Sequence, residues 1–479
     1  MSDFVFSLRR DGTAQLDSYE GNSEDIVIPA SYEGCDVTVI ADNAFSWQIQ
    51  ARSIVLPETV NTIGEAAFSW CEQLESINIP DAVHSIGEWC FIGCSSLREI
   101  HLPEGLRKIH YSTFQSCSSL TRLELPDSIR YIGPEAFSEC RSLTSVTLSK
   151  NLKTIGESAF SSCEMLTSIA LPASLTELGP NAFSGCVSLS AFLLPENHPV
   201  FRTENGVLFQ KTDQRLIFYP FQDSQANYDI PEGIRIIGEE AFAGRSSLQH
   251  VSVPSTVTVI EQRAFYGCKG LQSIDLPDSI VRIGASAFHS CSALEHIRLP
   301  SRLTLLEYSL FYGCSSLARV DLPEHLQILA NCVFSGCYSL QDPVWPEGLA
   351  EIGESAFEGC RSLETIILPE NLEAIGNHAF GSCTQLDTVQ LNKKLKQIPA
   401  WAFSRCENLN AVVIPEGLRE IGKEAFENCE NLLSLQLPES LEAIDPDAFV
   451  GCRHLMIFAW PKSTAYYFAK EQDIPCTEL

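Results

Sequence analysis

The 479-residue sequence lacks the features that mark several classes of protein. No apolar run approaches the ~18 residues that a membrane-spanning helix needs, so no membrane span is predicted. The N-terminus, MSDFVFSLRRDGTAQ, has no basic start followed by an apolar core, so no signal peptide is expected. Basic residues are also scarce: 32 Lys and Arg stand against 61 Asp and Glu, a net charge of −29. This negative field repels phosphates and argues against nucleic-acid binding.

Motifs for catalysis and metal binding are absent too. The sequence contains no P-loop, GxGxxG, HExxH or GxSxG pattern, and its ten histidines are scattered. No CxxC pair occurs among the nineteen cysteines, so a tetrahedral metal site is not expected. We therefore predict that the protein is not an enzyme and that it carries no cofactor or metal.

What the sequence does contain is a repeat of 23 residues, marked most clearly by phenylalanine. The residue five positions before each repeat Phe is aliphatic, and the residue six positions after it is Leu in every coil but one, where Ala51 stands. The seventeen phenylalanines in this frame are Phe45, Phe68, Phe91, Phe114, Phe137, Phe160, Phe183, Phe242, Phe265, Phe288, Phe311, Phe334, Phe357, Phe380, Phe403, Phe426 and Phe449.

One coil, residues 118–140 (SSLTRLELPDSIRYIGPEAFSEC), shows what each repeat position does. Leu123 lies in a short strand with its side chain buried, and Pro126 ends that strand because proline has no N–H for the ladder. Ile132 lies in a second short extended stretch, and Phe137 follows in a short helical turn. A single coil cannot enclose its own core, so stability must come from stacking neighbours. The pattern predicts a repeat solenoid with a parallel β-sheet, a short second strand and a short helical turn in each 23-residue coil.

The pattern LxxIxLPxx[LIV]xxIGxxAFxxC resembles the BspA-like leucine-rich repeat family over residues from about Ile26 to Pro461. The resemblance implies a right-handed arc, in agreement with the crossover rule for parallel strands. It also implies a bacterial protein, secreted or at the cell surface, that binds macromolecules. The absent signal peptide and the many cysteines instead favour a cytoplasmic location. Both locations stay open at this point.

The whole chain is expected to form one solenoid with a cap at each end. An insertion follows Phe183, where 59 residues separate two repeat phenylalanines instead of 23. Its segments VLFQ and RLIFY (207–210 and 215–219) predict a β-hairpin protruding from one edge, either without a function of its own or as a partner-binding protrusion. The expected segments are 1–25 (N-terminal hairpin cap around Asp11-Gly12), 26–194 (repeats), 195–231 (hairpin insertion), 232–461 (repeats) and 462–479 (helical cap with Ser463 as its N-cap).

The cysteines follow the repeat as well. Fifteen of the nineteen stand three residues after a repeat Phe and are expected to be reduced thiols that pack as small apolar groups. Gln48 and Arg245 interrupt this column, and we expect the insertion to give Arg245 a polar or solvated outlet. A further departure is the segment QDPVWP (341–346), for which a distorted strand is predicted, with the Trp345 indole filling volume beside Pro343.

A binding surface is predicted on the solvent side of the first strands, which we call the strand face. Variable side chains on a regular lattice are the means by which solenoids recognise ligands. The alternative is a solvated sheet face with incidental charges. The candidate residues are Glu99, His101, Arg122, Glu124, His250, Ser252, Asp275, His296, Arg298, Arg319 and Asp321.

A second surface is an acidic ridge, formed where the proline that ends a strand or the insertion is followed by Asp or Glu. Such like charges keep the molecule soluble and its edges apart. Alternatively, they form a cation- or glycan-binding surface. The leading prediction is a monomeric, non-catalytic protein-interaction or adhesion scaffold that binds a macromolecular ligand on the strand face; the alternative is a cation- or glycan-binding surface solenoid that uses the acidic ridge. The twelve ridge residues are Glu58, Asp81, Glu104, Asp127, Glu196, Glu232, Asp278, Glu324, Glu347, Glu370, Glu416 and Glu439.

Overall fold

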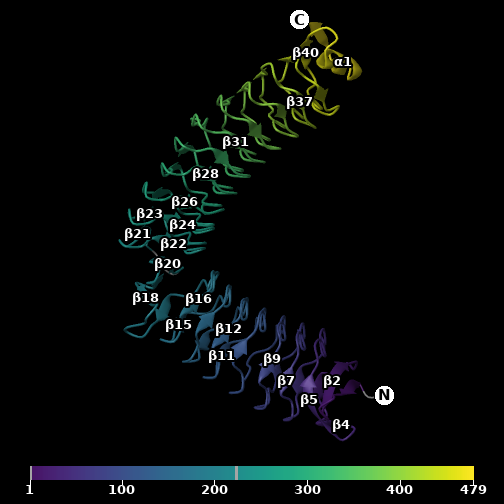
Figure 1. Ribbon diagram of the computed structural model, residues 1–479, viewed down its shortest axis with the longest axis vertical. Helices are drawn as coiled ribbons and strands as arrows, with labels where there is room; N and C mark the ends of the chain where they lie inside the picture. The colour runs from purple at the N-terminus through teal and green to yellow at the C-terminus, as the bar shows by residue number, and fades with distance from the viewer. Residues whose placement is uncertain (1–2, 222–224) are drawn as a thin grey trace. The chain divides into compact units, whose positions relative to one another are not determined.

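The computed structural model describes residues 3–221 and 225–479. Positions 222–224 of the expected insertion lie outside the described residues. The chain divides into two compact units, Met1–Asp223 (unit 1) and Ser224–Leu479 (unit 2) (Figure 1). Each unit is a stack of coils in which a residue pairs with the residue 23 positions further on, as Arg122 does with Ser145 and His250 with Ser273. The prediction of a leucine-rich-repeat solenoid with parallel strands is confirmed.

Most coils have two short strands on different sides of the core. The first strand follows the repeat Leu, and the second precedes the repeat Gly. In the coil 118–140, Leu123 of the first strand pairs with Val146 of the next coil, and Ile132 of the second pairs with Ile155. Because strand side chains alternate in direction, these central residues are buried while their neighbours face solvent.

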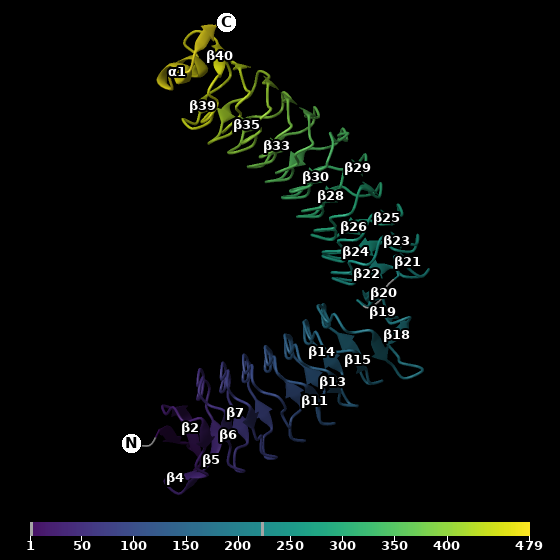
Figure 2. The same ribbon diagram turned by 180° about the vertical axis from the view of Figure 1, so that it is seen from behind.

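Unit 1 begins with an antiparallel pair and ends with an antiparallel meander, which enclose the parallel coils seen in Figure 2. The terminal strands are β1 (Phe4–Leu8), β2 (Ala14–Tyr19), β4 (Ser31–Tyr32), β5 (Cys35–Ile40), β18 (Phe201–Glu204), β19 (Val207–Gln210) and β20 (Arg215–Phe218). The first strands are β3 (Asp25–Val27), β6 (Ser53–Val55), β8 (Ser76–Ile77), β11 (Arg122–Glu124), β13 (Ser145–Thr147), β15 (Ser168–Ala170) and β17 (Ala191–Leu193). The second strands are β7 (Thr62–Ile63), β9 (Ser85–Ile86), β10 (Lys108–Ile109), β12 (Tyr131–Ile132), β14 (Thr154–Ile155) and β16 (Glu177–Leu178).

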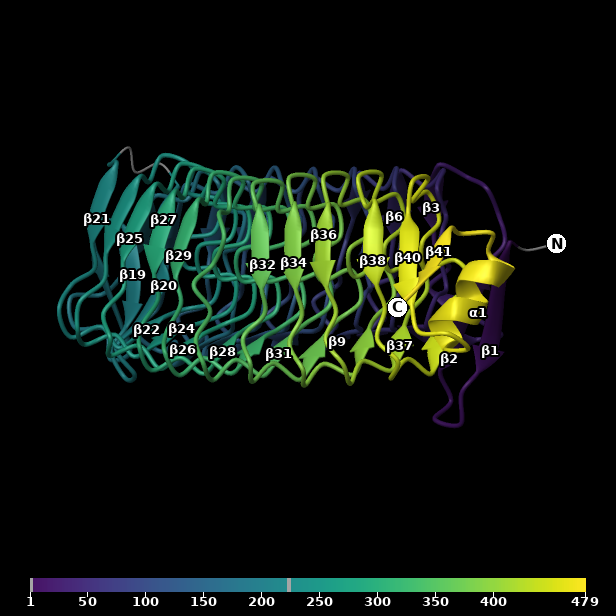
Figure 3. The same cartoon turned by 90° about the horizontal axis from the view of Figure 1, so that it is seen from above.

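Unit 2 repeats this arrangement and closes with a helix, and Figure 3 shows β32, β34, β36 and β38 side by side. Its first strands are β21 (Asn227–Asp229), β23 (His250–Ser252), β25 (Ser273–Asp275), β27 (His296–Arg298), β29 (Arg319–Asp321), β32 (Thr365–Ile367), β34 (Thr388–Gln390), β36 (Ala411–Val413), β38 (Ser434–Gln436) and β40 (Met456–Ala459). The second strands are β22 (Ile236–Ile237), β24 (Val259–Ile260), β26 (Arg282–Ile283), β28 (Leu305–Leu306), β30 (Ile328–Leu329), β31 (Glu351–Ile352), β33 (Ala374–Ile375), β35 (Gln397–Ile398), β37 (Glu420–Ile421) and β39 (Ala443–Ile444). After them come α1 (Thr464–Glu471) and β41 (Cys476–Glu478).

The segment around each repeat Phe is a series of turns and not the expected helical turn. Around Phe137, alternate N–H groups donate to the next coil, as Phe137 N does to Ala159 O at 2.8 Å. The intervening groups donate three residues back, as Cys140 N does to Phe137 O at 3.3 Å. Glu135 and Glu139 have φ values of 52° and 60°, which a right-handed helix excludes. The turns therefore carry their own hydrogen-bonded ladder between coils.

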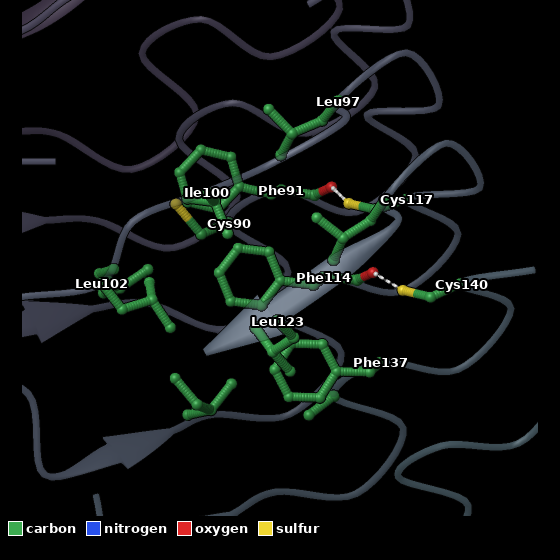
Figure 4. Packing of buried hydrophobic residues seen from close by; sticks show 14 of the residues in the cluster. Cys90, Phe91, Leu97, Ile100, Leu102, Phe114, Cys117, Leu123, Phe137 and Cys140 are labelled. Carbon is green, nitrogen blue, oxygen red and sulfur yellow. Dashed lines mark hydrogen bonds between the residues drawn. The ribbon is translucent and has the colours of Figure 1, made fainter. Parts of the chain in front are cut away.

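The centre of each unit is a column of stacked phenylalanine rings. Phe114 is fully buried and stacks on Phe91 and Phe137 with centroid distances of 5.3 Å on both sides. The thiol of Cys117 donates to the Phe91 carbonyl oxygen of the preceding coil at 3.2 Å, and Cys140 does the same to Phe114 at 3.3 Å (Figure 4). All fifteen column cysteines are free thiols that make this bond. The column thiols thus pack in the core and also donate hydrogen bonds to buried carbonyl oxygens.

The two residues that replace cysteine in this column both find backbone acceptors. The Gln48 amide donates to the Tyr19 carbonyl oxygen at 2.9 Å, and the Tyr19 ring extends the aromatic stack onto Phe45. Arg245 is buried, and its guanidinium donates to the Ala243 carbonyl oxygen of its own coil. Of the polar or solvated outlet that was expected, Arg245 has the polar one, because its buried guanidinium donates to a backbone carbonyl oxygen.

The inserted segment does not protrude. β18, β19 and β20 form an antiparallel meander, and its residues Phe201, Leu208 and Phe218 belong to the core of unit 1. Phe218 packs edge-on against Phe192 at 5.4 Å, which continues the aromatic column at the end of the stack. The Asn205-Gly206 turn needs glycine, because φ at Gly206 is +81° and a Cβ would lie 2.6 Å from the Ser190 carbonyl oxygen. The insertion covers the last apolar face of unit 1.

At the C-terminus, α1 covers the end of the stack in unit 2, as the insertion does in unit 1. Ser463 is the N-cap, and its side chain accepts a hydrogen bond from Tyr466 N at 3.2 Å. Phe468 packs edge-on against Phe449, the last ring of the column, at 5.9 Å. Figure 3 shows α1 beside β40 and β41, so the helix and the final strand cover the end of the stack. Within the described residues α1 is the single helix.

Candidate functional site

The strand face has the alternation that the sequence predicts. In β27, Ile297 is buried while His296 and Arg298 are exposed, and in β11 Leu123 is buried between exposed Arg122 and Glu124. The face thus presents polar side chains at a regular spacing on a fixed backbone. Exposed polar residues of the strand face lie in both units.

In unit 1 the predicted residues are few, and two of them form an ion pair with each other. Glu99 and His101 are exposed on either side of buried Ile100, in an extended stretch that is not a regular strand. Arg122 forms an ion pair with Glu124 two residues away on the same strand. Exposed pairs of this type contribute little to stability because water screens them.

In unit 2 the predicted residues form a charged network across adjacent strands. The Asp321 carboxylate accepts from His296 Nε2 at 3.0 Å and from Arg319 at 2.8–2.9 Å. Partial burial raises the pKa of Asp321, but hydrogen bonds from His296 and Arg319 outweigh it, and the pKa lies below its ordinary value. Asp321 therefore stays ionised and holds His296 and Arg319 in place above the sheet.

The neighbouring coils extend this polar surface. His250 Nδ1 lies 2.8 Å from Ser273 Oγ, and its Nε2 lies 3.4 Å from the Asp275 carboxylate. Ser252 is half-buried beside them. The structure therefore brings together His250, Ser273 and Asp275 at one place, and His296, Arg319 and Asp321 at another.

Arg298 instead turns toward the acidic ridge. It donates to Asp278 at 2.9 Å, and the N–H of Ser301 donates to the same carboxylate at 2.9 Å. These bonds, with the backbone N–H first in importance, lower the pKa of Asp278 to about 2. Asp127 and Glu416 likewise accept from the N–H of residues 150 and 439, one coil further on. Several ridge carboxylates thus support the loop of the next coil.

The regular sheet stops at residues 341–346. A distorted strand was predicted here, and the structure forms no first strand at residues 341–346, because Pro343 has no N–H to donate. The Asp342 carboxylate replaces the missing backbone acceptor: it accepts from Glu364 N at 2.8 Å and from Thr365 N at 3.0–3.1 Å. Asp342 therefore ties β32 to a coil that does not pair with it.

A cavity of about 390 Å³ opens beside this displaced coil. Its apolar lining comes from Val320, Leu340, Phe334 and Phe357 and from the displaced Pro343 and Val344, while Arg319, Asp321 and Asp342 contribute the polar side. Trp345 is half-buried and packs edge-on against Phe357 at 5.5 Å. Val344 is 88% exposed, the highest value among the large apolar residues. The cavity thus adjoins the charged network of β27 and β29.

Replacing Asp342 tests the role of its carboxylate. Asp342→Ala removes the acceptor for two backbone N–H groups and is expected to destabilise unit 2 by about 1–3 kcal/mol, the usual cost of losing hydrogen bonds to a charged group. Amide hydrogen exchange at Glu364 and Thr365 should accelerate. Asp342→Asn keeps one acceptor oxygen and serves as the matched variant. Unchanged exchange at both amides in Asp342→Ala would show that the side chain does not hold β32.

Sequence reasoning found the charged residues and the broken strand but missed Asp342 and the cavity. The sequence did contain an indication of this role, because Asp342 directly precedes Pro343. An aspartate can replace a backbone carbonyl as acceptor where a strand is interrupted. The cavity itself depends on how far the coil is displaced, and that displacement has no sequence signature.

The fold places the chain among the leucine-rich-repeat solenoids. The family model for the BspA type leucine-rich repeat region matches residues 19–122, 107–220, 214–341 and 330–456. The chain therefore belongs to the BspA-type leucine-rich repeat family, whose members generally serve as protein-interaction or surface scaffolds. No curated protein matches it significantly.

Solved bacterial structures with TM-scores above 0.5 share this fold. A leucine-rich cell surface protein from Faecalibacterium prausnitzii is 28% identical, with 86% of this chain and 93% of that chain covered and a TM-score of 0.51. A leucine-rich repeat protein from Eubacterium ventriosum is 23% identical, with coverage of 80% and 93% and a TM-score of 0.56. One from Bacteroides ovatus is 26% identical, with coverage of 96% and 99% and a TM-score of 0.48.

No helix in the described ranges has both the length and the apolar character to cross a membrane. No group of three or more His, Cys, Asp or Glu side chains converges there as metal ligands would. In unit 2 the described residues place a charged network next to an apolar-lined cavity.

Proposed function

We propose that the protein is a non-catalytic scaffold that binds a protein ligand on the strand face of unit 2, at β27, β29 and the coil 341–346. The observation that carries this proposal is the cavity of about 390 Å³, with apolar walls and with Arg319 and Asp321 at its polar side. Protein interfaces are typically centred on a large apolar side chain in a pocket and surrounded by polar contacts.

The charged residues beside the cavity orient the ligand whose apolar side chain enters it. Asp321 fixes Arg319 and His296 in one arrangement, so little side-chain entropy is lost when a partner binds them. Val344 exposes most of its side chain beside the cavity and adds apolar contact area. The family's general use as interaction scaffolds agrees with this assignment.

Capture of ligands by the immobilised full-length chain tests the proposal. A bacterial surface extract is expected to yield at least one retained protein, and the double variant Arg298→Glu/Arg319→Glu should retain roughly tenfold less of it, because charge reversal repels a partner that the wild type attracts. Val344→Glu should have a similar effect by placing a charge at the apolar edge.

The matched control is Arg419→Glu/Arg453→Glu, which changes the net charge by the same amount at exposed positions of unit 2 outside the strand face. This control should retain the ligand as the wild type does. Equal loss in both double variants would mean that retention depends on net charge and not on the proposed surface, and the proposal would then be wrong.

A further inference from the structure

Unit 2 contains a second depression, which differs in chemistry from the cavity at 341–346. It has a volume of about 590 Å³ and lies where four successive coils enter their first strands, β32, β34, β36 and β38. We call it the carboxamide groove. It is lined by Glu364, Thr365, Gln385, Asp387, Asn408, Asn410, Asn431 and Leu433.

Two parallel rows of side chains form the groove. One row is a ladder of amides at a spacing of 23 residues: Asn431 Nδ2 donates to Asn408 Oδ1 at 3.5 Å, and Asn408 Nδ2 donates to Gln385 Oε1 at 3.2 Å. Each amide has a second N–H and a second lone pair, so the ladder leaves donors and acceptors available along its length. The other row, two residues further along each coil, is Glu364, Asp387, Asn410 and Leu433.

The backbone beneath these side chains is fully engaged between coils. The carbonyl oxygen of Glu364 accepts from the N–H groups of Asp387 and Thr388 at 2.9 and 3.2 Å. The carbonyl oxygen of Asp387 accepts from Asn410 and Ala411 at 2.9 and 3.0 Å. The two rows are therefore presented on a rigid support, at the ~4.8 Å spacing of parallel strands. Such a preorganised row of polar groups suits an extended ligand with its own repeating polar groups.

The lining excludes several kinds of ligand. It contains no Lys or Arg, and its carboxylates repel anions, so a phosphate-bearing or sulfated chain is disfavoured. It offers no apolar pocket for the anchoring side chain of a peptide, since Leu433 alone is apolar. Amides outnumber carboxylates by four to two, and Asp387 already accepts from the Thr388 hydroxyl at 2.8 Å. The groove thus lacks the dense negative charge that a cationic ligand would need.

Hydroxyl groups are the ligand groups that match this lining. Each hydroxyl both donates and accepts, as each carboxamide does, and the two carboxylates accept further hydrogen bonds. Leu433, which is 53% exposed at one end, provides an apolar surface for the C–H face of a sugar ring. We infer that the carboxamide groove is a binding site for a neutral oligosaccharide that runs across the four coils. This function is separate from the protein binding proposed above and uses different residues.

The test is binding of the full chain to immobilised neutral oligosaccharides, namely cello-, manno- and galacto-oligosaccharide series, with heparin oligosaccharides and an oligolysine peptide alongside. The wild type is expected to bind at least one neutral series. Asn408→Ala/Asn431→Ala should weaken this binding roughly tenfold, because it removes several hydrogen bonds without adding charge.

The matched control is Asn371→Ala/Asn377→Ala, which removes two exposed amides of unit 2 outside the groove and should bind as the wild type does. Equal melting temperatures of the variants would show that folding is intact. Binding to no neutral oligosaccharide, binding to heparin or oligolysine alone, or unchanged affinity in Asn408→Ala/Asn431→Ala would each overturn the inference. Because Arg298 and Arg319 lie outside the groove, Arg298→Glu/Arg319→Glu should keep its oligosaccharide binding even if the proposed protein ligand is never found.

Discussion

Mild alkali is expected to unfold the protein, in a transition centred near pH 10. Burial raises the pKa of the Cys71, Cys140, Cys268 and Cys406 thiols to about 12. The pKa is also raised for nine further thiols. At Cys429 the largest cause is a hydrogen bond with a neighbouring thiol, and burial comes second. At the other eight the largest cause is burial; these are Cys90, Cys94, Cys117, Cys163, Cys291, Cys337, Cys360 and Cys383. The interior thus holds thirteen thiols that resist ionisation.

The sign of this effect follows from proton linkage. An unfolded thiol loses its proton near pH 9, whereas a buried one keeps it, so the folded state binds more protons above pH 9. Below pH 9 the buried neutral thiols make their full contribution to the free energy of unfolding. Above pH 9 this free energy falls by about 1.4 kcal/mol per thiol for each pH unit. Thirteen such groups at pH 10 cost on the order of 10–20 kcal/mol, which matches or exceeds the whole stability of a typical domain.

Two signals measured on one sample check this prediction. Circular dichroism reports the loss of β-structure, and ultraviolet absorbance of thiolate reports ionisation. Both should change together near pH 10, because most thiols ionise only when the coils open. If thiolate absorbance rose fully between pH 8 and 9.5 while the β-structure stayed native, the thiols would be accessible in the folded state and the linkage argument would fail.

The repeat allowed most of the fold to be predicted from the sequence. A position such as Phe114 has its equivalent in sixteen other coils, so one physical interpretation applies to every repeat. The column of Cys117 was identified as buried because a thiol at constant distance from a repeat Phe must occupy the same place in each coil. The outward direction of Arg298 and Arg319 followed from strand alternation alone.

The parts that could not be predicted depend on backbone conformation or on contacts with neighbouring coils. The turn around Phe137 places Glu135 and Glu139 at positive φ, although neither is Gly or Asn, the residues that usually mark this conformation. The alternating strands of the insertion indicated a hairpin, but nothing in them showed that Phe218 meets Phe192 in the core. The amide ladder through Asn408 could not be predicted because the residues before the first strand vary from coil to coil and carry no repeat pattern.

Truncating one ring of the phenylalanine column should have the largest effect of any single substitution. Phe114 is fully buried and stacks on Phe91 and Phe137, whose planes are parallel to it within 3°. Phe114→Ala leaves a cavity between two coils and removes both ring contacts, and is expected to cost about 3–5 kcal/mol. Stability in a solenoid is a sum over neighbouring coils, so this loss is concentrated in the coils on either side.

Hydrogen exchange read coil by coil is the measurement that resolves this effect, because long repeat arrays do not always unfold in a single step. Amides in the coils of Phe91, Phe114 and Phe137 should exchange faster in Phe114→Ala, while those near β1 and β2 change less. The matched control is Tyr131→Ala in the same unit, since Tyr131 is 37% exposed and its loss should cost little. Comparable destabilisation by both substitutions would contradict a central role for the column. A large effect confined to the Phe114 variant would instead show that the stacked rings hold neighbouring coils in register, and with them the strand face that these coils support.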